Sequence, residues 1–359
     1  MVWVAQSLTR LTTTVVYAAN SIAFLDDVEA CEGCGGGYPG PAQIGYIACD
    51  AVSAGTANVL YTITGGGTWT VTSADPGGAN EHISYVVIKR INKTQFRVIV
   101  GRITTDAANP AEIFYADVTF GAEATTTWTA VNVGSTNAET ITAIFWPTFS
   151  RLYVATSGGE IYLSTNQGAS FTQIYTSAVQ VNAFTRSPDG NVYAVGNTNT
   201  ILREVGESGT FSALTGPTGT NNSNGIAVAE NAIWLGNGTS IFYSRKLAPT
   251  AAGDWTSSKD FGTNHAVRGI SLKTNAQVMD TALLKSTLMH VLVNDSVGND
   301  GDVWLTADMG GYWQEVTNLT NSQYNAAYFS RVDPNLAFIV GEVDTATALI
   351  HKLAPSGGV

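Results

Sequence analysis

Charged residues are scarce in this chain. Asp, Glu, Lys and Arg make up 13% of its 359 residues, and 28 acids outnumber 17 bases, which gives a formal net charge of -11. Such a chain would repel the phosphates of nucleic acid and of anionic lipid, and no stretch rich in Lys and Arg offsets the charge. The charge balance therefore speaks against nucleic acid or an anionic membrane as a partner.

Cysteines and long apolar runs are also lacking. The three cysteines, Cys31, Cys34 and Cys49, are too few for a disulfide scaffold in a chain of this size. No run approaches the roughly 20 apolar residues that a membrane-spanning helix requires. The first ten residues lack the basic start and apolar core of a secretory signal. We therefore expect a protein made in a cytoplasm, with no membrane insertion.

Strong helix formers give way to Thr, Ser, Asn and Gly along most of the chain. This composition suits many short strands joined by tight turns. At 44% hydrophobic residues, the chain can bury a large core. We predict an all-β protein in which residues 1–359 form a single domain.

One stretch, residues 306–313, has the composition of a tight hairpin corner. Its pattern is Ser/Thr-x-Asp-x-Gly-x-x-Trp, and its defined positions are Thr306, Asp308, Gly310 and Trp313. The Asp308 carboxylate can accept backbone N–H bonds across the turn, and Gly310 supplies a left-handed backbone conformation. Weaker copies of the pattern contain Ser164, Asn166, Gly168 and Phe171, and Thr62, Gly66 and Trp69.

This pattern resembles the Asp-box (BNR) β-propellers, a family that includes sialidases, other glycosidases, assembly factors and many phage-encoded proteins. The resemblance implies four-stranded antiparallel blades with the box between the third and fourth strands, so one aromatic residue should open each fourth strand. Spacings of about 40 to 60 residues fit one aromatic per blade. The seven candidates are Trp3, Trp69, Trp128, Phe171, Phe211, Trp255 and Trp313. We predict seven blades, with six as the alternative.

The two ends of the chain are predicted to share one blade. Only three strands follow Trp313, whereas Trp3 and the residues after it resemble the start of the strand at Trp128. Residues 1–10 would then supply the missing fourth strand, because a blade without it has an unpaired edge. Two insertions interrupt the blades: a loop rich in Cys and Gly at 26–43 and a loop at 274–286.

Cys31 and Cys34 form a Cys-x-x-Cys pair, which can hold zinc or act as a redox dithiol. Zinc usually needs four ligands, and Cys49 is the one remaining cysteine. The four histidines have no ligand spacing: His82, His265, His290 and His351. A structural disulfide or free thiols in the inserted loop is the favoured interpretation.

The stretch from Asp295 to Asp302 contains closely spaced Asp and Asn oxygens that could coordinate calcium. Its spacing does not match an EF-hand, and Asp, Asn and Gly are also ordinary turn residues. Calcium binding therefore stays open, and we predict no resident metal or cofactor.

Sialidases of the Asp-box family have a Phe/Tyr-Arg-Ile-Pro motif and further arginines that grip the substrate carboxylate. The nearest string here is Phe96-Arg97-Val98-Ile99, which lacks the Pro. The other arginines near inner-strand ends are Arg151, Arg186 and Arg268, and the acids that could act in catalysis are Asp106, Asp117, Glu139, Asp189, Asp254 and Asp260. These acids have the setting of turn residues, so we expect no enzyme.

We predict a structural or binding propeller, in the first place a bacteriophage virion component that engages other virion subunits, copies of itself or a cell surface, with a surface glycan as a further possible partner. A cellular scaffold, assembly factor or adhesin, located in the cytoplasm, is the alternative, and a sialidase-like glycoside hydrolase is the second. Because propellers bind through inserted loops, the expected partner faces are 26–41, 119–127, 247–253 and 274–286.

Overall fold

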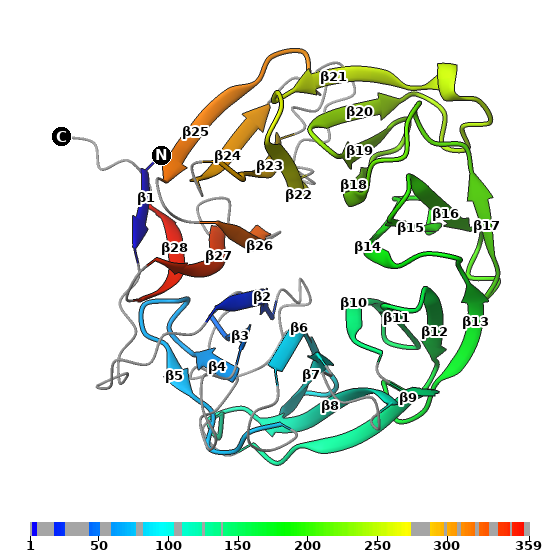
Figure 1. Ribbon diagram of the computed structural model, residues 1–359. Helices are drawn as coiled ribbons and strands as arrows, with labels where there is room; N and C mark the ends of the chain where they lie inside the picture. Colours follow the sequence, from blue (N-terminus) through cyan, green and yellow to red (C-terminus); the bar gives the residue numbers. More distant parts are fainter. Residues whose placement is uncertain are drawn as a thin grey trace. The chain divides into compact units, whose positions relative to one another are not determined.

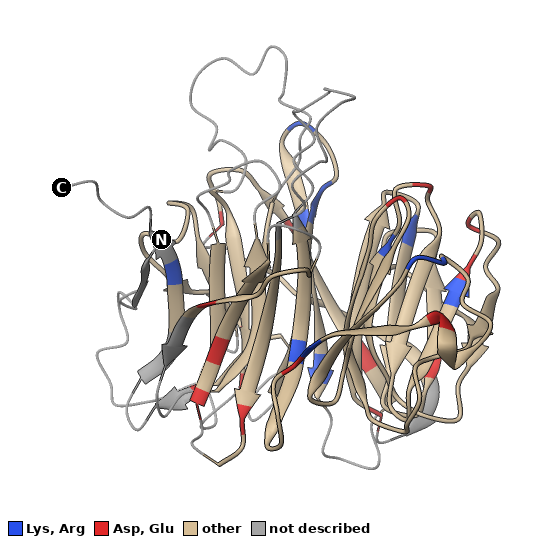
Figure 2. Ribbon diagram, turned by 90° about the horizontal axis from the view of Figure 1, so that it is seen from above, with Lys and Arg blue, Asp and Glu red and all other residues tan. Residues whose placement is uncertain are grey.

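The computed structural model describes residues 2–5, 18–25, 43–50, 59–76, 82–103, 110–123, 126–137, 139–273, 288–297, 300–306, 310–319, 323–329, 337–344 and 347–354. Figure 1 shows strands throughout this part of the chain, and the one helical element among them is a short 3-10 turn, Ala252–Asp254. No helix in the described ranges is long and apolar enough to cross a membrane. Figure 2 shows how few charged residues the ribbon carries.

The strands form seven four-stranded antiparallel sheets. The first has β2 (Ala19–Phe24), β3 (Gly45–Cys49), β4 (Val59–Thr62) and β5 (Thr70–Val71). The second has β6 (His82–Arg90), β7 (Gln95–Ile103), β8 (Pro110–Thr119) and β9 (Thr129–Asn137). The third has β10 (Ile141–Thr148), β11 (Arg151–Thr156), β12 (Glu160–Ser164) and β13 (Thr172–Thr176).

The fourth sheet has β14 (Val181–Arg186), β15 (Val192–Gly196), β16 (Thr200–Glu204) and β17 (Phe211–Leu214). The fifth has β18 (Ser223–Val228), β19 (Ile233–Asn237), β20 (Ser240–Ser244) and β21 (Thr256–Asp260). The sixth has β22 (His265–Lys273), β23 (Leu288–Asp295), β24 (Asp300–Thr306) and β25 (Gln314–Leu319). The seventh has β26 (Tyr324–Phe329), β27 (Ala337–Asp344), β28 (Thr347–Ala354) and β1 (Val2–Ala5).

This arrangement confirms the seven-bladed β-propeller, and the alternative count of six is wrong. Each sheet runs from an inner first strand to an outer fourth strand in chain order, and the seventh takes β1 from the other end of the chain. The N-terminal closing strand is therefore confirmed. By its internal contacts the chain groups into two compact units, residues 3–180 with 325–359, and residues 1–2 with 181–324. The interpretation of residues 1–359 as one domain stays a prediction.

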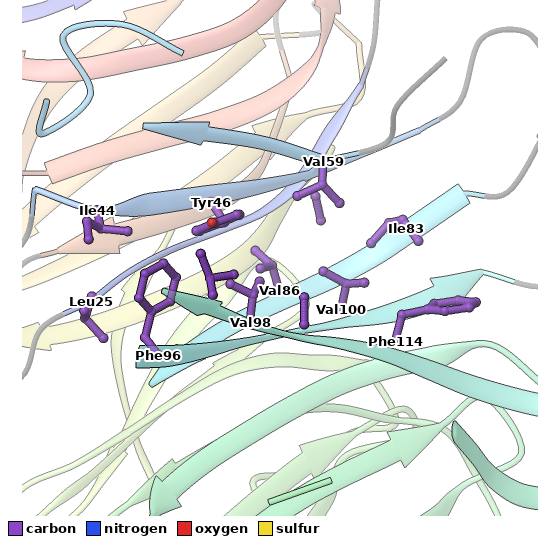
Figure 3. Close-up of a cluster of buried hydrophobic side chains, with 13 residues drawn as sticks. Leu25, Ile44, Tyr46, Val59, Ile83, Val86, Phe96, Val98, Val100 and Phe114 are labelled. Atoms are coloured by element: carbon purple, nitrogen blue, oxygen red, sulfur yellow. The ribbon is translucent and has the colours of Figure 1, made fainter. Parts of the chain in front are cut away.

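Neighbouring sheets pack face to face through the side chains of their middle strands. All five residues are buried in each of the second strands β3, β15 and β19. For β3 and β19 the reason is a packed sheet on both sides. In Figure 3, side chains of the first sheet, among them Tyr46 and Val59, meet Phe96 and Val98 of the second. Burial of such apolar area is the main favourable term in folding.

Every described inner strand from β2 to β22 contains a β-bulge near its start. The register slips at one residue in each: Asn20, Ser84, Thr142, Asn182, Asn224 and Arg268. An extra residue of this kind leaves the ladder and redirects its side chain. Most of these side chains are short and polar, so they can bond beyond their own sheet.

The bulge side chains bind the inner strand of the next sheet. Asn20 Nδ2 donates to the Ile83 carbonyl at 2.9 Å, and Ser84 Oγ donates to the Ile141 carbonyl at 2.6 Å. The same bond recurs from Asn182 to Ser223 (3.1 Å), from Asn224 to Val267 (3.1 Å) and from Asn325 of β26 to Ala19 (3.2 Å). We call these bonds the bulge clasps. They join sheets that would otherwise be held mainly by non-directional apolar contact.

The sixth sheet departs from this pattern. Its bulge residue, Arg268, is exposed and makes no clasp among the described residues. Asn294 of β23 takes over the connection, because its Nδ2 donates to the Tyr324 carbonyl at 2.8 Å and its Oδ1 accepts from the Tyr324 N–H at 2.9 Å. The link to the next inner strand is thus kept by a different side chain.

Replacement of Asn224 by Ala tests the clasps. The change removes the bond that Asn224 donates to the Val267 carbonyl and the bond that its Oδ1 accepts from Asn182 Nδ2. We therefore expect the free energy of unfolding to fall by about 1 to 3 kcal/mol. Arg268→Ala is the matched control and should change it by less than about 0.5 kcal/mol. Urea denaturation measures both. Equal losses for the two variants would contradict the role of the clasps.

Removal of residues 1–10 tests the closing strand. Without β1, the ladder edge of β28 loses its partner, so the thermal unfolding midpoint should fall markedly. A chain that lacks residues 356–359 instead serves as the control and should melt as the full chain does. An unchanged midpoint after the N-terminal deletion would show that β1 does not close the last blade.

Candidate protein-binding surface

Each sheet has two ends, and we call one of them the corner end. It carries the turn between the first and second strands and the Asp-box corner between the third and fourth. The opposite end carries the turn between the second and third strands and the connection to the next sheet. The predicted box residues all fall at corner ends.

The corner between β12 and β13 shows how the box works with Asn in the acidic position. Gly168 donates its N–H to Ser164 Oγ at 2.8 Å, and Ser170 donates its N–H to Asn166 Oδ1 at 2.9 Å. Asn166 Nδ2 also donates to Ser170 Oγ at 2.8 Å. Gly168 has φ of 90°, a left-handed conformation that suits glycine. The turn donors are thereby satisfied by side chains of the corner itself.

The other two predicted corners repeat part of this network. Gly66 donates its N–H to Thr62 Oγ1 at 3.1 Å, and Thr68 donates its N–H to Thr64 Oγ1 at 2.9 Å, so a hydroxyl replaces the carboxylate. Between β24 and β25, Gly310 donates its N–H to Thr306 Oγ1 at 2.9 Å. Asp308 lies outside the described residues, so its predicted turn bonds stay a prediction.

Tryptophans that open fourth strands bond to the outer part of the preceding sheet. Trp128 Nε1 donates to the Ala74 carbonyl at 3.0 Å, Trp255 Nε1 to the Thr215 carbonyl at 2.8 Å, and Trp313 Nε1 to Ser258 Oγ at 3.1 Å. Trp69 and Phe211 are buried, and Phe171 packs against the apolar cluster between the second and third sheets. The side chain of Trp3 lies outside the described residues. These aromatics are structural links between sheets.

The corner before Phe211 has no box in the sequence, yet it has a substitute. Glu204, at the end of β16, is fully buried and accepts the Gly209 N–H at 2.5 Å. Glu204 occupies the position that Ser or Thr has in the box, and its longer side chain reaches across the turn. The blade pattern is kept although the sequence signature is lost.

The arginines considered for carboxylate recognition do not form one group. Arg97 grips Asp117 through Nε and Nη2, at 2.6 and 2.7 Å, and donates from Nη1 to the Gln167 carbonyl at 2.8 Å. Arg186 pairs with Glu207 at 3.2 Å. Arg151 donates to the Tyr153 hydroxyl at 2.7 Å. Each belongs to its own blade, and Arg97 is already bidentate on a protein carboxylate.

Most of the candidate acids serve turns. Asp189 bonds to Ser187 and Asn191 in the turn after β14. Hydrogen bonds lower the pKa of Asp254, first from Lys246 and then from backbone, and that of Asp260, first from the Gly262 N–H. Asp106 lies outside the described residues.

Glu139 and Glu160 form a carboxyl pair in the third blade. A Cβ on Gly158 would lie 2.5 Å from an oxygen of each, so both side chains converge on this glycine. Burial, and then the charge of Glu160, raise the pKa of Glu139. Glu139 is 7% exposed, and Glu160 accepts a bond from Thr156 at 2.6 Å. The pair thus lies at the turn between β11 and β12, with Glu139 buried and Glu160 partly buried.

The metal-site candidates fall into two parts. Cys31 and Cys34 lie outside the described residues, whereas Cys49 is a free, buried thiol of β3 whose pKa is raised by burial. Next to the calcium candidate, both amide atoms of Asn294 are used by Tyr324. Among the residues that the structure describes, no group of three or more His, Cys, Asp or Glu could hold a metal ion.

Of the expected partner loops, 247–253 is packed onto the neighbouring blade. Tyr193 donates its hydroxyl to the Leu247 carbonyl at 2.8 Å, and the Thr215 N–H donates to the Pro249 carbonyl at 3.2 Å. In the loop at 119–127, Phe120 contacts Phe96 and lies under the Arg90 guanidinium. The loop 274–286, and all of 26–41, lie outside the described residues.

Large exposed apolar side chains favour the corner ends. The described residues include five of them. Four lie at corner ends, in the turn between the first and second strands or in the turn between the third and fourth: Ile63, Phe149, Val205 and Tyr312. Val297, 75% exposed, lies in the turn between β23 and β24 at the opposite end. Figure 2 shows that Lys and Arg also lie mainly toward one end of the strands, whereas Asp and Glu occur at both. Apolar and basic groups therefore meet at the corner ends.

The fold is shared with many solved structures. YCF48 bound to D1 peptide is 13% identical over 99% of this chain and 97% of its own (TM-score 0.62). A chain of a mitotic checkpoint complex is 11% identical over 94% and 87% (TM-score 0.59), and a virginiamycin B lyase from Staphylococcus aureus is 15% identical over 98% and 99% (TM-score 0.61). No family model and no curated protein matches. These likenesses show the propeller fold, which serves both binding proteins and an enzyme.

The bulge clasps were missed in the sequence, although a signal for them is present. The clasp residue follows an apolar or small residue and precedes a small one in Ala19-Asn20-Ser21, Val181-Asn182-Ala183 and Tyr324-Asn325-Ala326. Ser84 replaces the Asn in the second blade, and the bulge residue of the third is Thr142, which hides the repeat. Their partners are backbone carbonyls, and a sequence pattern does not reveal those.

Asp302 is a buried acid in β24. The residue is 6% exposed, and its Oδ1 has no hydrogen-bond partner among the described residues. Burial, and then the charge of Glu315, raise its pKa to about 6. An acid of this kind destabilises the folded state when it is ionised.

Asp302→Asn tests this assignment. The folded chain binds more protons than the unfolded chain between about pH 4 and pH 6, so wild-type stability should rise as the pH falls through that window. The variant should lose this rise and be more stable at pH 7 by about 2 kcal/mol. Asp260→Asn, at an acid with a lowered pKa, should give no gain at pH 7. Denaturant titrations at pH 5 and 7 that fail to separate Asp302→Asn from wild type would contradict the assignment.

Proposed function

We propose that this chain is a non-enzymatic β-propeller that binds protein partners through the corner ends of its blades. The observation that carries this proposal is the placement of exposed apolar side chains. Phe149 and Tyr312 project from turns that a folded monomer has no need to make apolar, and aromatic residues are enriched where proteins bind each other. Single exposed hydrophobics are common, so the bias toward one end of the blades is the argument.

The structural neighbours support a role of the scaffold type. YCF48 was solved with a peptide, and the checkpoint chain belongs to a multiprotein complex. The alignments cover 99% of this chain for YCF48 and 94% for the checkpoint chain. We therefore favour a cellular scaffold or assembly role over a virion component.

A virion role has one observation in its favour, the surface poor in Lys and rich in Thr, Asn and Gly. The identity of the bound proteins separates the two roles. Capsid, tail or fibre subunits would favour the virion component, and cellular proteins would favour the scaffold.

Quantitative affinity purification tests the proposal. Wild type, a Phe149→Ser/Tyr312→Ser variant and a Val297→Ser control are used as baits, because Val297 is an exposed apolar residue at the opposite end. We expect proteins bound by wild type and by the control to fall about tenfold or more with the double variant, since such anchors carry much of an interface's affinity. Matched unfolding midpoints establish that all baits are folded.

Two results would overturn this function. One is a partner set that depends on Val297 and is indifferent to Phe149 and Tyr312. The other is turnover of a small-molecule substrate by the purified chain, for which sialosides and β-glucans are the first to screen.

A further inference from the structure

The second and third sheets separate their charges between their two ends. At the corner ends the described residues are five bases, Lys89, Arg90, Lys93, Arg97 and Arg151, and two acids, Asp117 and Glu123. The opposite ends have one base, Arg102, and three acids, Glu112, Glu139 and Glu160. The formal charge is thus +3 at one end and -2 at the other. We call the first set of residues the basic end.

Hydrogen bonds hold the basic end in a fixed geometry. Register places Lys89 beside Arg97, and Arg97 beside Asp117. Lys89 Nζ donates to the Trp146 and Pro147 carbonyls at 3.4 Å, which links the second sheet to the end of β10 in the third. Arg97 reaches the Asp-box corner of the third sheet at Gln167. Charges that are held in place in this way need little reorganisation when a partner binds.

Aromatic side chains lie among these cations. Phe149, 45% exposed, stands in the turn between β10 and β11, two residues before Arg151. Arg90 lies 5.1 Å above the Phe120 ring, and Arg97 lies 4.1 Å above the Tyr115 ring. The surface therefore offers an apolar contact at Phe149 next to a positive potential, and Lys93 extends that potential as an exposed side chain.

We propose that the basic end binds an acidic protein segment that carries at least one large apolar side chain. This inference rests on the proposed function and names the surface and the chemistry of the partner. Carboxylates complement the net positive charge, and an apolar side chain covers Phe149. A nucleic acid fits less well, because the chain as a whole has a net charge of -11 and would repel a phosphate backbone.

Fluorescence anisotropy with three labelled probes tests the inference. The probes are an acidic peptide with one Phe, the same peptide with every Glu replaced by Gln, and a single-stranded oligonucleotide. We expect the acidic peptide to bind, the Gln peptide to bind at least about tenfold more weakly, and added salt to weaken the acidic peptide selectively.

Matched variants locate the site. Lys93→Glu should raise the Kd of the acidic peptide about fivefold or more, and Phe149→Ser should raise it by a similar factor. Arg268→Glu makes the same change in net charge at an exposed site outside the basic end, so it should leave the Kd within about twofold. Circular dichroism confirms that the variants are folded.

Three outcomes would overturn the inference: no binding of the acidic peptide, equal weakening by Lys93→Glu and Arg268→Glu, or binding of the oligonucleotide in preference to the peptide. Each leaves the proposed function standing if captured partners still depend on Phe149 and Tyr312. Conversely, the proposed function would fail alone if the acidic peptide bound at the basic end while no protein partner depended on those two residues.

Discussion

The hydrogen bond from the bulge of one inner strand to the carbonyl of the next is the interaction on which the rest of this structure depends. Apolar packing between sheets is strong but does not fix how far one sheet slides along its neighbour. A short side chain that leaves its own ladder and meets a specified carbonyl does fix that offset. Asn20, Ser84, Asn182 and Asn224 make such a bond from a bulge, and Asn325 makes the same kind of bond from β26. Within each compact unit, these bonds fix the offset between the sheets that they join.

The two ends of each blade differ in structure. The inner-strand bulges and the Glu139–Glu160 pair lie away from the corner ends. Apart from the exposed Arg268, the bulge residues are at least partly buried. The corner ends use Ser, Thr, Asn and Gly to close their turns locally. The corner that carries the exposed Tyr312 keeps its Gly310 N–H bonded to Thr306. We propose that recognition takes place at these ends because it disturbs folding least there.

The sequence predicts the architecture well, because that depends on local and periodic signals. The box at Thr306 and its weaker copies, with one aromatic per blade, give the blade number and the closing strand. It predicts the surface poorly. The loop 247–253 has the composition of a free insertion, yet it is anchored by Tyr193 and Thr215. The basic end could not be predicted from the sequence, because Lys89 reaches β10 only through the packing of two sheets, and Arg97 lies beside Lys89 only through strand pairing.

The central claim is that partners bind at the corner ends, and hydrogen–deuterium exchange of the chain with and without a captured partner tests it most directly. The account predicts slower exchange on binding in the turns at residues 91–94 and 149–150, with no change in the turn at 157–159 at the opposite end. Protection confined to 157–159, with the corner-end turns unchanged, would contradict it.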